Sequence, residues 1–322
     1  MQTIFENLGA KAESHWFSDS EYDLESKDKT VSVVLEKPGA KPKSYLIPVG
    51  ESDLERINAL GAIVNESSVN WLSSQVSSHG IPKSAKFLDV GCGPGGLTTL
   101  FASIFPEIEF VGVDLYPEQI SIAKKTAEEK RLTNIAWDVC DIFHLEELQE
   151  KHPELFDIVH CRFVISHLKD PEGAVDKLLT MVKPGGLVII GECGSHFKFV
   201  SQWNKGMDAW NKMVVLQHRL QQSHKDTSDR IMNHLSTIDK VVSCESRFYD
   251  APIEGQLKKS LFRKGVEQAL EKIPKLGLPP ETIQKFGYEN GETWLNDMRE
   301  FENDESASLW LRKFECIAAK VH

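Results

Sequence analysis

The stretch KFLDVGCGPGGLT, residues 86–98, decides the fold of this chain. A short apolar run, a glycine-rich turn and an amphipathic segment follow one another, and this order predicts a strand, a tight loop and a helix. Glycine permits a positive φ and lets the backbone touch a ligand, because it has no Cβ. The N-terminus of the following helix adds unpaired N–H groups. The stretch therefore predicts a ligand lying against Gly91–Gly96.

The spacing of Gly91, Gly93 and Gly96 literally matches the dinucleotide fingerprint, which is a weak signal on its own. Two local features argue against NAD. Asp89 places a negative charge where it opposes a pyrophosphate but suits a cationic ligand, and Pro94 stiffens the loop. We therefore expect a cationic ligand rather than NAD.

Length and composition limit the kinds of protein that this chain can be. The chain has 322 residues, 41% of them apolar, which suits one large domain or two small ones. A net charge of −11 argues against nucleic acid or an anionic membrane as the main partner. Six scattered cysteines form no Cys-x-x-Cys pair, which favours reduced thiols and argues against a zinc site. No signal peptide or membrane span is recognisable, so we expect a cytoplasmic protein.

Before the glycine-rich stretch, residues 1–84 predict a polar arm with scattered aromatic residues, a hairpin over 31–49 and a helix from Ser52. Exposed aromatic side chains in a polar arm are costly, so we expect part of this arm to pack on the body of the protein. After it, residues 85–192 alternate between strand and helix. The predicted strands are 85–90, 109–113, 134–140, 156–161 and 187–191, and the predicted helices are 96–105, 117–131 and 171–182. This alternation predicts a doubly wound parallel sheet, with the ligand at the carboxyl ends of its strands.

Polar side chains stand at those predicted strand ends. Asp114 follows the second strand, 21 residues after Gly93, where its carboxylate can accept from both ribose hydroxyls of a nucleoside. Asp141 follows the third strand, and Arg162 follows the fourth. Each carboxylate alone could simply cap a helix, but the set predicts a nucleoside pocket. The ribose does not separate NAD from other nucleoside cofactors.

At residues 88–95, 156–171 and 182–186 the chain resembles the class I S-adenosylmethionine-dependent methyltransferases. The resemblance covers about residues 85–192. It implies S-adenosylmethionine as cofactor and S-adenosylhomocysteine as product. It also implies that Asp141 accepts from the adenine amino group while the N–H of Ile142 meets a ring nitrogen. The cofactor-binding residues that we expect are Asp89, Gly91, Cys92, Gly93, Asp114, Leu115, Asp141, Ile142 and Arg162.

The resemblance further implies an α/β fold: a mostly parallel seven-stranded sheet with an antiparallel last strand, a Rossmann-like methyltransferase fold with a helical cap. We expect a single domain, 1–322, in which residues 193–322 supply the cap helices and the last two strands. A helix is predicted over 197–224, and strands are predicted over 239–249 and 310–321.

Methyl transfer from a sulfonium needs alignment more than acid–base chemistry, and a base only where the acceptor must lose a proton early. His167, just past the fourth strand, is the candidate catalytic residue, although it could simply orient a loop. His160, Glu192 and His196 are further candidates. No metal site is expected.

The sequence therefore predicts methyl transfer to oxygen or nitrogen of a small organic molecule, of the secondary-metabolite or quinone kind. One alternative is methylation of a protein. Another is a fold that binds the cofactor without transferring methyl and serves as a scaffold or a cyclase. The expected partner is a small-molecule acceptor, without nucleic acid or membrane, and the sequence sets no oligomeric state.

Overall fold

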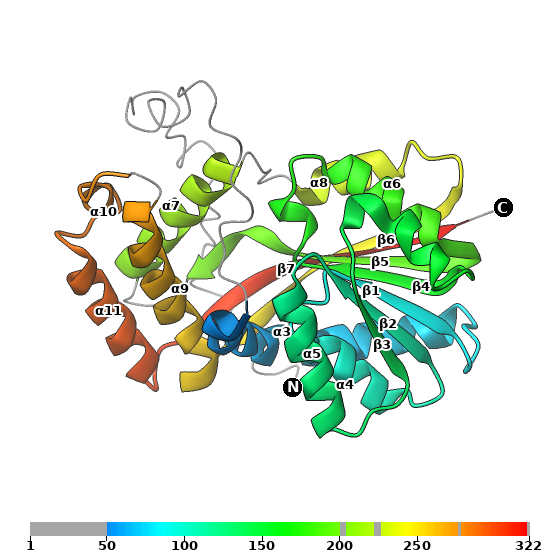
Figure 1. Ribbon diagram of the computed structural model, residues 1–322. Coiled ribbons are helices and arrows are strands. Elements are labelled where there is room, and N and C mark those ends of the chain that lie inside the picture. Colours follow the sequence, from blue (N-terminus) through cyan, green and yellow to red (C-terminus); the bar gives the residue numbers. More distant parts are fainter. Residues whose placement is uncertain (1–49, 200–203, 222–226, 276–277, 321–322) are drawn as a thin grey trace, which may run out of the picture. The chain divides into compact units, whose positions relative to one another are not determined.

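The computed structural model describes residues 50–199, 204–221, 227–275 and 278–320 (Figure 1). All of them belong to a compact unit that begins at Pro38. The predicted polar arm and the hairpin over 31–49 lie outside the described residues. The single domain spanning 1–322 therefore stays a prediction.

A seven-stranded sheet with the order β3-β2-β1-β4-β5-β7-β6 forms the centre of this unit (Figure 1). Strands β1 to β5 pair in parallel, and β7 runs antiparallel between β5 and β6. This arrangement confirms the predicted sheet with its antiparallel last strand. The strands are β1 Lys86–Val90, β2 Glu109–Asp114, β3 Ile135–Val139, β4 Phe156–Arg162, β5 Val182–Phe199, β6 Val241–Ile253 and β7 Leu309–Lys320.

Helices cover both faces of the sheet, because alternate strand residues point to opposite sides. Leu88 and Val90 pack with α6, α8 and η4, whereas Phe87 packs with α3 and α4 on the other face. The elements of these two layers are η3 Gly50–Asp53, α3 Leu54–Ser78, α4 Gly96–Ile104, α5 Pro117–Glu129, η4 Ile142–Glu150, η5 Ile165–His167, α6 Pro171–Met181 and α8 Thr227–Leu235.

The remaining helices form a helical cap, which we define as α7 Asn204–Gln221, α9 Gln256–Lys275, α10 Thr282–Lys285 and α11 Gly291–Asn303. Helices α7 and α11 both pack on α9, and α9 also packs along α3 (Figure 1). Part of the predicted cap helix over 197–224 is wrong, because residues 197–199 are strand. Their backbone continues β5 and pairs with Leu309–Leu311 of β7. The helices of the described ranges include none with the length and hydropathy that a bilayer crossing would need.

The indole ring of Trp137 leaves no room for a side chain at two glycines, one in β2 and one in the loop after β1. A Cβ on Gly112 of β2 would lie 2.4 Å from this ring, and a Cβ on Gly95 would lie 2.6 Å from it. Trp137 is buried, with 8% of its surface exposed, so it has little room to move. Both positions, one in β2 and one in the loop after β1, therefore need glycine for steric reasons.

We predict that Gly112→Ala lowers the free energy of unfolding by about 1–3 kcal/mol, because the added methyl overpacks the Trp137 contact. Urea unfolding measures this change. Gly96→Ala is the control, since a Cβ there meets nothing within 4 Å. It should change the stability by less than about 1 kcal/mol. Equal effects of the two substitutions would contradict the steric role of Trp137.

Candidate functional site

The carboxyl ends of five parallel strands meet at one edge of the sheet, which we call the strand-end site. The register pairs Val90 with Val113 of β2 and with Cys161 of β4. It also pairs Asp114 with Val139, and Arg162 with Gly191. Residues that directly follow these positions are therefore neighbours in space, at the place where the strand order reverses between β1 and β4.

The loop after β1 is held in a conformation that glycine favours. Gly91, Gly93 and Gly95 have φ angles of +71°, +56° and +76°. The N–H groups of Gly91 and Cys92 both donate to the carbonyl oxygen of Val113, at 2.8 and 2.9 Å. The loop therefore bends over the end of β2.

Only part of this loop is packed against protein. A Cβ on Gly91 would lie 2.2 Å from Val164, and one on Gly95 would lie 2.8 Å from Ala123. A Cβ on Gly93 would meet nothing within 4 Å. Gly93 thus presents bare backbone to open space, as close approach of a ligand requires.

Asp114 joins the loop to the end of β2. Its Oδ2 accepts a hydrogen bond from the N–H of Gly93 at 3.0 Å, and its Oδ1 accepts one from the N–H of Tyr116 at 3.0 Å. Burial raises the pKa of this carboxyl, while the same two N–H groups oppose the rise. Each carboxylate oxygen keeps acceptor capacity for a ligand hydroxyl. Leu115 beside it is half exposed, at 51%.

Asp89 lies beneath the loop and contacts protein rather than open space. It is buried, with 3% exposed. Its Oδ2 accepts from the hydroxyl of Thr98 at 2.5 Å, and its Oδ1 lies 2.8 Å from Nδ1 of the buried His160. Asp89 therefore ties the start of α4 to β4, and His160, one of the base candidates, takes part in the same structural contact.

Asp141 and Ile142 begin η4 after the third strand. Asp141 accepts from the N–H of Phe143 at 3.0 Å, while about a third of its side chain stays exposed. The side chain of Ile142 is buried in the core. The capping role considered for a single acid is real here, and the second carboxylate oxygen, Oδ2, lies 3.9 Å from Nδ1 of His144.

Arg162 at the end of β4 is directed toward α3. Its guanidinium donates to Asn65 Oδ1 at 2.9 Å and to Ser68 Oγ at 3.1 Å. It also lies over the ring of Phe163, 5.2 Å from the centroid. Phe163 itself has a φ of +58°, an uncommon value for a residue with a side chain. Arg162 thus fixes α3 to the strand-end site.

Glu192 anchors the loop that follows β4. It is 1% exposed, and its Oε1 accepts from the N–H groups of Val164, Ile165 and Ser166 at 3.1, 2.8 and 3.3 Å. Its Oε2 accepts from the Ser166 hydroxyl at 2.7 Å. Burial raises the pKa of Glu192 to about 7, although these donors favour the charged form. Glu192, proposed from sequence as a further base, therefore positions the loop.

His167 ends that loop and is half-buried. Its imidazole lies nearly parallel to that of His218 on α7, with 6.3 Å between the ring centroids and 9° between the planes. The contact brings the candidate catalytic residue to the boundary between the strand-end site and the helical cap. His196, the remaining base candidate, has a side chain outside the described residues.

Several partners in this site were missed from sequence: Asn65, Ser68 and Thr98. They lie on helices, at positions where polar residues are common, so nothing in their spacing marks them. Across the described ranges, no three His, Cys, Asp or Glu side chains are arranged to hold a metal ion. The site offers backbone N–H groups, carboxylates and open space beside Gly93.

Comparisons with known proteins bear on this geometry. A family model described as methyltransferase domain matches residues 81–254. An uncharacterized methyltransferase of Schizosaccharomyces pombe is 34% identical over 119 residues, 35% of this chain and 41% of the relative. The ubiquinone biosynthesis O-methyltransferase of Coxiella burnetii is 29% identical over 136 residues, 42% of this chain and 53% of the relative. The chain thus spans about half the length of the curated relatives it matches.

Among solved structures, the YcgJ protein of Bacillus subtilis aligns with a TM-score of 0.48 and 18% identity. The alignment covers 78% of this chain and 98% of that one.

The environment of Glu192 predicts a pH-dependent stability. The carboxyl titrates near its ordinary value of 4.5 when unfolded and at about 7 when folded. The unfolded state therefore loses its proton first, and stability falls as the pH rises from about 4.5 to about 7. The expected loss is about 3 kcal/mol at most, at 1.36 kcal/mol per pKa unit.

Glu192→Gln should remove this fall, since an amide oxygen can still accept from the three N–H groups. Urea unfolding of both proteins at pH values from about 5 to about 8 measures the difference. The exposed Glu128→Gln is the control and should leave the fall in place. A pH dependence that persists unchanged in Glu192→Gln would contradict the assignment.

Proposed function

The chain belongs to the methyltransferase domain family, and on that premise we propose that it transfers a methyl group from S-adenosylmethionine to oxygen or nitrogen of a small organic molecule. The observation that carries the proposal is the open backbone at Gly93 beside the Asp114 carboxylate, at the carboxyl edge of a parallel sheet. This edge is where such sheets bind ligands.

The residues of the strand-end site fit this cofactor. In the proposal, the loop Gly91–Gly96 approaches it through backbone, as the absence of a Cβ allows. Asp114 accepts from its ribose hydroxyls, and Asp141, whose side chain is about a third exposed, accepts from its adenine amino group. Leu115 and Ile142 lie beside the adenine ring. Asp89 holds the glycine-rich loop in place, and Arg162 holds α3 in place.

When bound, S-adenosylmethionine supplies an electrophilic methyl group on a sulfonium sulfur. The chain then has to align the acceptor and exclude water. In our proposal Glu192 fixes the backbone of Val164–Ser166, so that His167 faces the acceptor from a rigid loop. His167 accepts the acceptor's proton or orients its hydroxyl.

The acceptor proposed here is an apolar or aromatic molecule of the secondary-metabolite or quinone kind. One observation supports this class: several curated relatives are named for O-methylation in ubiquinone biosynthesis. The relatives favour oxygen as the acceptor atom. We further propose that the protein works in a reducing, cytosol-like compartment. Four free thiols support this: Cys92, Cys140, Cys161 and Cys244.

Release of S-adenosylhomocysteine tests the proposal. The protein is incubated with S-adenosylmethionine and a panel of phenols, hydroquinones and amines, and the product is quantified by mass spectrometry. Release that depends on one of these acceptors supports methyl transfer to a small molecule. Binding of S-adenosylhomocysteine without acceptor-dependent release would instead support the scaffold or cyclase alternative. Methyl incorporation into added protein alone would support protein methylation.

We predict that Gly93→Ala weakens S-adenosylhomocysteine binding at least about tenfold, because the methyl enters the open space that the ligand uses. Isothermal titration calorimetry measures the affinity. Gly80→Ala is a matched control, since Gly80 has a φ of +63° and a Cβ there also meets nothing within 4 Å. Both should lose about 1–2 kcal/mol of stability, and only the first should lose affinity. Equal affinities would contradict the loop assignment.

We predict that His167→Gln lowers kcat about 100-fold while leaving S-adenosylhomocysteine affinity unchanged, as loss of a proton acceptor does. The rate is measured with an acceptor from the panel, together with its pH profile. His79→Gln, at the exposed end of α3, is the control. A kcat within about twofold of the unsubstituted enzyme would show that His167 does not take the proton.

A further inference from the structure

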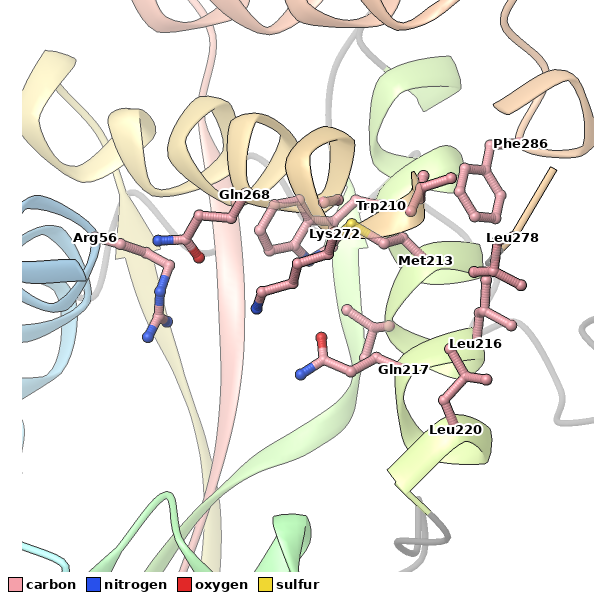
Figure 2. A pocket seen from close by; sticks show the side chains of 14 residues that line it. Arg56, Trp210, Met213, Leu216, Gln217, Leu220, Gln268, Lys272, Leu278 and Phe286 are labelled. Carbon is pink, nitrogen blue, oxygen red and sulfur yellow. The ribbon is translucent and has the colours of Figure 1, made fainter. Parts of the chain in front are cut away.

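A cavity of about 120 Å³ lies between α3, α7 and α9, with Leu278 before α10 and Phe286 directly after it completing the wall (Figure 2). Its apolar part is formed by Trp210, Met213 and Leu216 of α7 and by Ile273, Leu278 and Phe286. Its polar part is formed by the ends of Arg56, Gln217, Gln268 and Lys272. None of these residues belongs to the strand-end site.

The first cation of the cavity is already balanced. The guanidinium of Arg56 binds both carboxylate oxygens of Asp53, at 2.7 and 2.6 Å. Asp53 is 1% exposed and also accepts from Gln268 at 2.6 Å. A buried carboxylate held by a guanidinium and an amide adds no net charge to the cavity wall.

The second cation is not balanced in this way. Within the part of the chain that the structure describes, the ammonium of Lys272 has no ion pair or hydrogen bond. Figure 2 shows its nitrogen between the polar ends of Arg56 and Gln217, inside the cavity. Burial, with Arg56 nearby, lowers its pKa to about 8, and Asp53 and Glu271 oppose that shift. The cavity wall therefore carries one uncompensated positive charge in a chain whose net charge is −11.

We propose that this cavity binds an amphipathic organic anion, with its apolar body against Trp210, Met213 and Leu216 and its acidic group on Lys272. A half-buried ammonium gains most from a charge-assisted hydrogen bond, and a carboxylate fits it. Gln217 can donate a second hydrogen bond from its amide. A neutral apolar ligand would use the walls but would leave the ammonium unpaired.

Helix α3 connects this cavity to the strand-end site. Arg56 lines the cavity, whereas Asn65, nine residues later, binds Arg162 at the end of β4. At 1.5 Å per residue these two positions on α3 are about 14 Å apart along its axis. The cavity's lining residues differ from those of the strand-end site, and anion binding is measured without methyl transfer. On α7 the two places come close, because His218, which stacks on His167, directly follows the lining residue Gln217.

The test uses two probes of one shape: naphthalene-2-carboxylate and its neutral amide, naphthalene-2-carboxamide. Isothermal titration calorimetry on the full chain should show tighter binding of the carboxylate. Lys272→Met keeps the apolar stem and removes the charge. It should weaken the carboxylate at least about tenfold and leave the amide unchanged. The carboxylate's advantage should also fall as the pH rises through about 8, since the ammonium then loses its proton.

Two further variants make the result specific to this cavity. Lys275→Met removes an exposed charge of the same helix, which acts on Lys272 only through space, and should weaken the carboxylate far less than Lys272→Met does. Ala269→Phe fills the cavity from its wall and should weaken both probes. The proposal is overturned if Lys272→Met and Lys275→Met affect the carboxylate equally, or if Ala269→Phe leaves both probes bound as before. Circular dichroism spectra that match the unsubstituted protein establish that each variant is folded.

Discussion

The Asp114 carboxylate is the contact on which the strand-end site depends, because it links the glycine loop to the end of β2 through the N–H groups of Gly93 and Tyr116. The same loop, with three glycines at positive φ, is also held by the N–H groups of Gly91 and Cys92, which donate to the Val113 carbonyl oxygen. The indole of Trp137 supports the same loop sterically at Gly95. Together they leave Gly93 as bare backbone facing open space, which is the feature that the proposed cofactor would use.

Three buried or half-buried carboxylates lie around this loop, and they differ in what they contact. Asp89 is committed to Thr98 and His160, and Glu192 is committed to the N–H groups after β4. Burying a carboxylate is costly unless donors surround it, and each of these has them. Asp114 differs because it stands at the edge of the sheet beside a half-exposed residue, Leu115. Two of these carboxylates thus hold protein segments together, while the third is the one that we propose to contact a ligand.

Most of the fold could be predicted from sequence, because near-continuous apolar strands alternate with amphipathic helices between Lys86 and Gly191. The positions of Asp114, Asp141 and Arg162 at strand ends followed from the same pattern. Partners could not be predicted: which groups meet Arg162 or Glu192 depends on how α3 and the loop after β4 pack. Lys272 was missed because a lysine on an amphipathic helix looks like a solvated residue until the cavity beside it is seen. The helical periodicity over 197–224 predicts helix from Phe197 onward. Residues 197–199 are strand because they pair with β7, and a partner so distant in sequence cannot be read from local spacing.

The central claim is that the strand-end site binds S-adenosylmethionine rather than a dinucleotide. Thermal unfolding with S-adenosylmethionine, S-adenosylhomocysteine and NAD added in turn tests it most directly. A ligand at about 100 times its dissociation constant stabilises the native state by about 2.7 kcal/mol, which raises Tm by several degrees. The account predicts this rise with the first two ligands and none with NAD. A rise with NAD alone would contradict it and would make the glycine loop a dinucleotide site.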